Sequence, residues 1–119
     1  MPYSDGYVVP VPRAKLAANR RLARKAGKLW IEHGALAVNE CAADAVKPGE
    51  LASFPQGAKL KDGETVVFSW IAYRSRKERD RINAKVMADP RLAPMMDPAR
   101  LPFGGKRMVW GGFKPVVRL

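Results

Sequence analysis

The chain has 119 residues, enough for one hydrophobic core and too few for two, so we predict a single domain over residues 1–119. Its 22 Lys and Arg residues outnumber 11 acidic residues, and the formal charge of +11 raises the question of a polyanionic partner. The only cysteine, Cys41, excludes a disulfide within the chain, and the first residues lack the pattern of an export signal. Because no uncharged apolar run approaches the ~20 residues of a membrane-spanning helix, we expect a cytoplasmic protein with no membrane partner.

The first predicted elements are a strand within residues 3–11 and a helix from Arg13 to about His33. We expect the ladder of the strand to stop near Val9, because Pro10 and Pro12 have no amide hydrogen to donate. One side of the helix carries a narrow stripe of mostly small or apolar residues at the helical period, which lets the helix lie close to a sheet. The stripe consists of Leu16, Asn19, Ala23, Ala26, Gly27 and Trp30.

A second strand is predicted over residues 35–41, with Leu36 and Val38 on one face. Cys41, at its end, is expected to be a small core residue. Residues 42–61 contain two turn signals, and we expect residues 51–60 to form a short strand or a flap, since long structureless loops are uncommon in compact domains.

The strongest strand signal covers residues 64–73, a run rich in Val, Ile, Phe, Trp and Tyr that lacks Gly and Pro. Both of its faces carry apolar side chains, so both are expected to be buried. A helix should follow, with Ser75 and Glu78 at the spacing of a capping box and with Ile82, Val86 and Met87 facing inward.

That helix should end at Asp89-Pro90, because the residue before a proline disfavours the helical conformation. Four prolines within residues 90–102 then predict ordered coil, a long irregular stretch able to act as a lid. The last predicted strand covers residues 107–113, where Gly111 and Gly112 indicate a bulge or a close approach by another backbone.

The resulting order of strand, helix, strand, strand, helix, strand predicts an α+β, ferredoxin-like βαββαβ fold with two helices on one face of an antiparallel sheet. The other face also appears apolar in the sequence, and a chain of this size cannot cover it. We therefore predict a homodimer with its sheets packed face to face.

Several segments also resemble the YbaA-like family of uncharacterised bacterial proteins. They are DGYVVPVP (5–12), HGAL (33–36), ETVVFSW (64–70), NAKVMADPR (83–91) and PFGGKRMVWGGF (102–113). The resemblance spans nearly the whole chain and implies the fold of the dimeric α/β-barrel superfamily. It implies no reaction. The chain departs from the family in its basic first helix and in residues 53–57, which leaves open whether its partners are shared.

Candidate site residues follow from what this fold brings to one cavity between sheet and helices. His33 is the candidate proton acceptor, since its unperturbed pKa lies near neutrality, although a place at the negative end of a helix is sufficient to explain it and is the more common case. Ligand contacts are expected from Trp30, Ser69, Trp70, Asn83, Phe103 and Arg107. The tryptophans fit a core or dimer interface as well as a pocket. One His and one Cys cannot supply a zinc site, so we predict no metal, and no cofactor is indicated.

The first function hypothesis is a homodimer that binds an unknown small molecule, apolar or weakly anionic, with cofactor-free oxygenase-like or isomerase-like catalysis as its reaction class. The second is nucleic-acid or polyanion binding through the basic first helix, and the third is a purely structural or interaction role. The cations of the second hypothesis are Arg20, Arg21, Arg24, Lys25 and Lys28.

Overall fold

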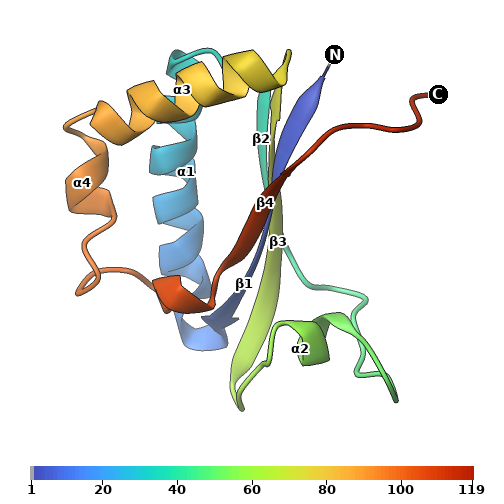
Figure 1. Cartoon of the computed structure of the whole chain (residues 1–119). Helices are drawn as coiled ribbons and strands as arrows, with labels where there is room; N and C mark the ends of the chain where they lie inside the picture. The colour runs from blue at the N-terminus through green and yellow to red at the C-terminus, as the bar shows by residue number, and fades with distance from the viewer. Residues whose placement is uncertain (1) are drawn as a thin grey trace.

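A computed structural model describes residues 2–119 and shows a four-stranded sheet with helices on one side (Figure 1). The strands are β1 (Tyr3–Pro12), β2 (Ala37–Ala42), β3 (Glu64–Tyr73) and β4 (Val109–Phe113). The long helices are α1 (Leu16–Glu32) and α3 (Arg76–Ala88), and the short ones are α2 (Phe54–Gly57) and α4 (Leu92–Met95). Single 3-10 turns occupy η1 (Arg13–Lys15) and η2 (Gly105–Arg107).

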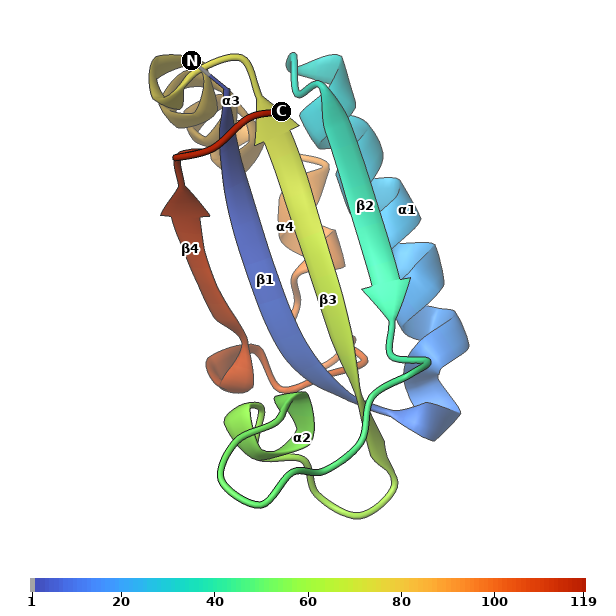
Figure 2. The same cartoon turned by 90° about the vertical axis from the view of Figure 1, so that its right-hand side faces the viewer.

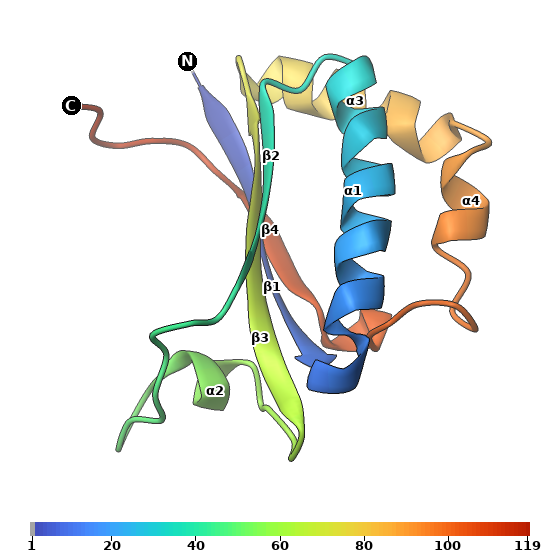
Figure 3. The same ribbon diagram turned by 180° about the vertical axis from the view of Figure 1, so that it is seen from behind.

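The strands lie in the order β2-β3-β1-β4, and all three neighbouring pairs are antiparallel (Figure 2). Helices α1, α3 and α4 cover one face, which we call the inner face. On the side of the opposite, outer face lie α2 with its flanking loop at one end and the C-terminal segment that follows β4 (Figure 3). The predicted α+β, ferredoxin-like arrangement is thus confirmed.

Alternation along β3 assigns each side chain to a face. Ser69, Ile71 and Tyr73 point inward, while Phe68 and Trp70 point outward, where their rings lie 5.7 Å apart. The inner core packs Ile71 and Tyr73 against helix residues such as Leu29, Ile82 and Val86. A second, smaller core at the other end joins Val9 and Val11 to Val67. The outer face is less covered than the inner face: Phe68 on the outer face is 43% exposed, whereas Ile71 on the inner face is 6% exposed.

The prediction that the ladder of β1 ends near Val9 is wrong, since β1 pairs with β3 as far as Pro12. The amide of Arg13 donates to Gly63 O on the β3 side at 2.8 Å. Amides alternate along a strand, so the nitrogens of Pro10 and Pro12 face the β4 side. There β4 pairs with β1 only up to Val8, and the two prolines remove no ladder hydrogen bond.

Helix α3 begins as its sequence predicts, because Ser75 Oγ accepts a hydrogen bond from the Glu78 amide at 3.1 Å. The reciprocal half of the capping box is replaced by an ion pair between Glu78 and Arg81. Ile82 and Val86 are fully buried, as expected, but Met87 is 64% exposed and does not belong to the core.

Three further expectations are corrected. Residues 51–60 hold the short helix α2, which begins at the cap Ser53 and carries Pro55 in its first turn. The proline-rich stretch holds α4 rather than coil alone, with Leu92 buried in the core. Cys41 is exposed on the outer face of an edge strand, where nothing packs over it as a core would require.

No helix within residues 2–119 is long and apolar enough to cross a membrane.

Candidate functional site: a cavity between the sheet and the helices

The inner face of the sheet and the helices enclose a cavity of about 310 Å³ that is mostly apolar. Its aromatic walls are Trp30, Phe103 and Trp110, and three methionines, Met87, Met96 and Met108, also line it. The polar groups that reach it are Tyr7, Asn19, Glu40, Ser69 and Asn83. An apolar chamber with a few convergent polar groups is the usual form of a small-molecule site.

Glu40 supplies the carboxylate of the cavity. It lies on β2 opposite Ser69 of β3, and its Oε1 accepts a hydrogen bond from Asn19 Nδ2 at 3.3 Å. Glu40 is exposed as a whole residue, but the protein around its carboxyl group removes water from it, and this desolvation raises the pKa of the carboxyl. Hydrogen bonds from Asn19 and Ser69 offset part of that rise. A carboxylate with a raised pKa is a stronger base than a free one.

Tyr7 supplies a hydroxyl to the same space. Its ring stacks on Trp110 with centroids 6.2 Å apart and planes 16° apart. Burial, followed by the nearby charge of Asp5, raises the pKa of the Tyr7 hydroxyl far above its usual value. The group therefore stays protonated at neutral pH and can donate a hydrogen bond into the cavity.

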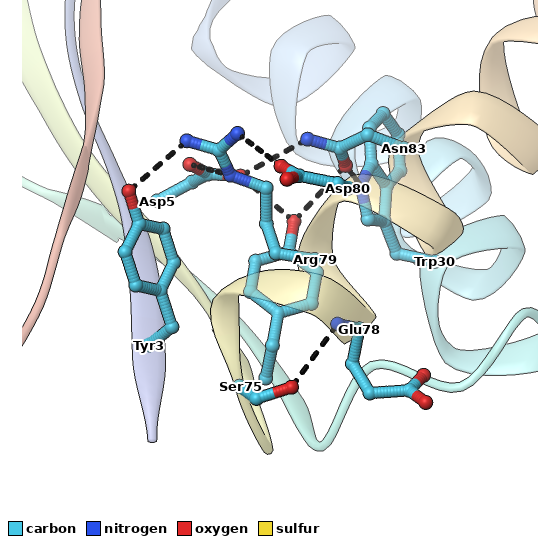
Figure 4. Close-up of polar contacts among 9 residues, drawn as sticks. Tyr3, Asp5, Trp30, Ser75, Glu78, Arg79, Asp80 and Asn83 are labelled. Carbon is cyan, nitrogen blue, oxygen red and sulfur yellow. Dashed lines mark hydrogen bonds and ion pairs between the residues drawn. The ribbon is translucent and has the colours of Figure 1, made fainter. Parts of the chain in front are cut away.

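A buried polar network closes one end of the cavity (Figure 4). Asp5 is fully buried and accepts hydrogen bonds from Tyr73 Oη at 2.9 Å, Arg79 Nε at 3.1 Å and Asn83 Nδ2 at 3.2 Å. Asn83 Oδ1 in turn accepts from Trp30 Nε1 at 2.9 Å and lies 3.1 Å from Tyr73 Oη, whose single hydrogen is shared between Asn83 and Asp5. These bonds use most of the capacity of Asn83 and fix Trp30 as a wall.

Arg79 is held between three partners in this network (Figure 4). Its guanidinium lies 5.0 Å from the centre of the Tyr3 ring and also pairs with the exposed Asp80 at 2.8 Å. Gly112 of β4 passes directly over this point, and a Cβ there would collide with Arg79 and the Tyr3 hydroxyl. The expected close approach by another backbone is wrong at Gly112, because the groups that lie over it are side chains.

The structure brings four of the expected ligand-contact residues to the cavity, namely Trp30, Ser69, Asn83 and Phe103. Trp70 instead lies on the outer face beside Phe68. Arg107 forms a two-pronged pair with Glu64, at 2.7 and 3.0 Å, and is not among the lining residues.

His33 lies just beyond α1 and also outside the lining. Its Nε2 is 3.0 Å from Asp89 Oδ2. Hydrogen bonds from Arg91 and His33 hold the pKa of the Asp89 carboxyl well below its usual range. His33 thus joins the end of α1 to the end of α3.

Sequence reasoning missed Tyr7, Asn19 and Glu40 as site residues. Signals were present: Asn19 lies in the otherwise small and apolar stripe of α1, and Glu40 shares its strand face with Val38. A polar residue in an apolar register is the pattern that marks a lined cavity.

The five candidate polyanion-binding cations, Arg20, Arg21, Arg24, Lys25 and Lys28, are all exposed on α1. Within residues 2–119 none of them forms an ion pair. They therefore leave a strongly positive surface on this helix.

Solved structures similar to this chain share its fold at low sequence identity. SnoaB, a cofactor-independent oxygenase from Streptomyces nogalater, has a TM-score of 0.63 and 12% identity over 99% of this chain and 96% of that one. A putative antibiotic biosynthesis monooxygenase from Nitrosomonas europaea has a TM-score of 0.63 and 12% identity over 97% and 90%. A nipsnap family protein with unknown function from Agrobacterium tumefaciens has a TM-score of 0.57 and 15% identity over 96% and 87%.

Curated relatives are much closer in sequence. The uncharacterized protein YbaA of Escherichia coli is 44% identical over 117 residues, covering 98% of both chains, and YbaA of Shigella flexneri gives the same values. The model of a protein family of unknown function, DUF1428, matches residues 2–105. The chain therefore belongs to this family of unknown function.

Proposed function

We propose that the chain binds a small, mainly apolar organic molecule in the cavity and exchanges a proton with it through Glu40. The observation that carries the proposal is the position of a carboxyl with a raised pKa in the lining of an otherwise apolar, aromatic-walled chamber. Such a combination of cavity and perturbed carboxyl is a typical signature of a catalytic acid or base. The fold supports it as an analogy, since one similar structure is that of a cofactor-independent oxygenase.

The chemistry follows from the two groups that face the ligand. A carbon or oxygen acid in the cavity gives its proton to a Glu40 carboxylate oxygen, and the electron pair stays on the ligand as an enolate or phenolate. Tyr7, kept protonated, donates a hydrogen bond to the oxygen on which this charge develops. Return of the proton to another atom gives an isomerase-like outcome. Attack of the same anion on dioxygen begins an oxygenase-like one.

The test uses 2-tetralone, a flat apolar ketone with exchangeable α-hydrogens, in deuterated buffer followed by NMR. The protein should accelerate hydrogen–deuterium exchange, and Glu40→Gln should reduce the protein-catalysed rate by roughly 10²-fold or more, the usual worth of a general base. Tyr7→Phe should give a smaller loss.

Position in the cavity is tested with a filling variant. Ala26→Leu, which projects into the chamber, should slow the exchange, whereas Ala84→Leu on the exposed side of α3 should not. Exchange no faster than in buffer, or a rate unaffected by Glu40→Gln, would contradict the proton-transfer role.

We also propose that the active unit is a homodimer joined through the outer face of the sheet. Phe68, Val109 and Phe113 are 43%, 60% and 64% exposed on that face, beside the half-buried Trp70. A contiguous apolar surface of this kind typically marks an interaction site, and a second copy presents the matching surface.

Sedimentation tests the dimer with two neighbouring substitutions on opposite faces of β3. Trp70→Arg should yield a folded monomer, because an unpaired charge cannot be buried between two sheets. Ile71→Arg places the charge in the inner core and should prevent folding. A native chain that sediments as a monomer would exclude this assembly.

A further inference from the structure

A second hollow lies between α1 and the edge strand β2, and it has a volume of about 900 Å³. Its walls include Ala23, Gly27, Val38 and Ile31, which are apolar or lack a side chain. The helix and strand approach closely at Gly27, where an added Cβ would lie 3.1 Å from Val38 Cγ1. We call this hollow the α1–β2 groove.

The groove lies directly beside the cavity, because five residues line both. Asn19, Ala23, Gly27, Val38 and Glu40 appear on both sides of the boundary. The Asn19–Glu40 hydrogen bond, at 3.3 Å, lies on this shared boundary between the groove and the cavity.

Three cations line the groove. Arg20, Arg24 and Lys28 recur every fourth residue along α1, which sets them in one row on the same side of the helix. Within residues 2–119 none of the three has an acidic partner in an ion pair. The acidic groups that face the groove are Glu32, which pairs with Arg91 at 2.7 Å, and Glu40, which Asn19 binds. The row of positive charge is thus not neutralised by the protein.

We infer that the ligand is an amphiphilic organic anion whose apolar body lies in the cavity and whose anionic group binds Arg20, Arg24 and Lys28 in the α1–β2 groove. This inference rests on the proposed function, since it assumes that the cavity is the binding chamber. It assigns the positive charge of α1 to substrate recognition. The route of entry is between α1 and β2, with Asn19 and Glu40 at its inner end.

The alternative use of the same charge is diffuse attraction of a polyanion. Arg21 and Lys25 belong to the same helix and are exposed, but they do not line the groove. A polyanion held by its phosphates would draw on all five cations nearly equally. An anion bound in the groove would depend only on the row formed by Arg20, Arg24 and Lys28. This difference allows an experiment to distinguish ligand binding in the groove from diffuse attraction of a polyanion.

Two probes with the same aromatic body test the inference by fluorescence titration. N-phenyl-1-naphthylamine is uncharged, and 1-anilinonaphthalene-8-sulfonate adds one sulfonate. The measured quantity is the ratio of the sulfonate's affinity to that of the uncharged probe, so that differences in apolar binding cancel. The groove variant is Arg20→Gln with Arg24→Gln, and the matched control is Arg21→Gln with Lys25→Gln, which removes the same charge from the same helix.

The ratio should fall roughly fivefold or more in the groove variant, from two partly exposed charge contacts of up to ~1 kcal/mol each, and should change by less than about twofold in the control. Affinity for the uncharged probe should stay the same in both. An equal fall in both variants would overturn the inference in favour of diffuse polyanion attraction, and an unchanged ratio in the groove variant would overturn it as well. If the native chain binds the uncharged probe at no site sensitive to Ala26→Leu, the proposed function fails first, and the inference fails with it.

Discussion

Two polar clusters lie on the inner face of the same sheet, and they differ in how fully their hydrogen bonds are used. In the first, the buried Asp5 carboxylate receives three side-chain donors, and Asn83 connects it to Trp30. In the second, Glu40 receives hydrogen bonds from Asn19 and Ser69, and Tyr7, for whose side chain no hydrogen bond is found within residues 2–119, also lines the cavity. The first cluster is closed on itself, whereas the second keeps capacity for a ligand.

The difference separates a scaffold from a site. A satisfied buried network holds its elements in one arrangement, and here it ties the start of β1, the end of β3 and helix α3 together. An incompletely satisfied group in a partly open chamber costs stability, and proteins accept that cost where a ligand or a reaction uses it. Substitutions in the two clusters should therefore have opposite signatures, with stability lost in one and function lost in the other.

The largest effect is expected at Asp5. Asp5→Asn keeps the shape of the side chain but leaves the largely buried Arg79 without its buried charge partner, with only the exposed Asp80 remaining, so the free energy of unfolding should fall by roughly 3–5 kcal/mol. Asp80→Asn removes the other carboxylate of Arg79, which is 55% exposed, and should cost less than about 1 kcal/mol. Urea denaturation of both variants measures the contrast. Equal losses would mean that the Asp5 network is not the anchor of the fold.

A smaller effect is expected at the glycine that makes room for this network. Gly112→Ala would force the Arg79 guanidinium and the Tyr3 ring aside, at a cost of about 1–3 kcal/mol. Gly111→Ala, one residue earlier in β4, meets only ordinary contact with Phe113 at 3.7 Å and should be nearly neutral. Thermal unfolding of the two variants tests the point. A Gly112→Ala protein as stable as Gly111→Ala would show that the network adjusts without loss.

The fold was largely predictable because its strands and helices carry independent local signals. The run of residues 64–73, the Ser75 cap and the small-residue stripe of α1 all indicate the same arrangement. The wrong predictions concern features of one element that depend on a neighbouring element. Pro10 and Pro12 were expected to end β1, yet they are tolerated because β4 stops at Val8, and that length is a property of another strand.

The site was less predictable because its residues come together only in three dimensions. His33 was chosen for its intrinsic pKa near neutrality, but its contact with Asp89 places it outside the cavity lining. Glu40 has an ordinary intrinsic pKa, and only its place against Asn19 and Ser69 makes it distinctive. Arg107 was expected to bind an anionic ligand, but its guanidinium pairs with Glu64, which lies 43 residues away in the sequence.

The smallest and most specific effect is the pH dependence that Glu40 gives to stability. Because the folded protein raises the pKa of the Glu40 carboxyl, the folded state binds its proton more tightly than the unfolded chain does. Stability therefore falls as the pH rises from the unfolded pKa of about 4.3 to the folded pKa of Glu40, above which the penalty is complete, and the penalty vanishes below the unfolded value. Glu40→Gln should raise the melting temperature slightly at pH 7, and the difference from the native chain should shrink to nothing as the pH falls below that value.

Glu64→Gln is the opposite control: Arg107 lowers the pKa of Glu64, so this variant should be less stable at pH 7 and should approach the native chain only in acid. A Glu40→Gln variant that is less stable than the native chain at pH 7 would place Glu40 with Asp5 among the structural anchors and remove the contrast between the two clusters.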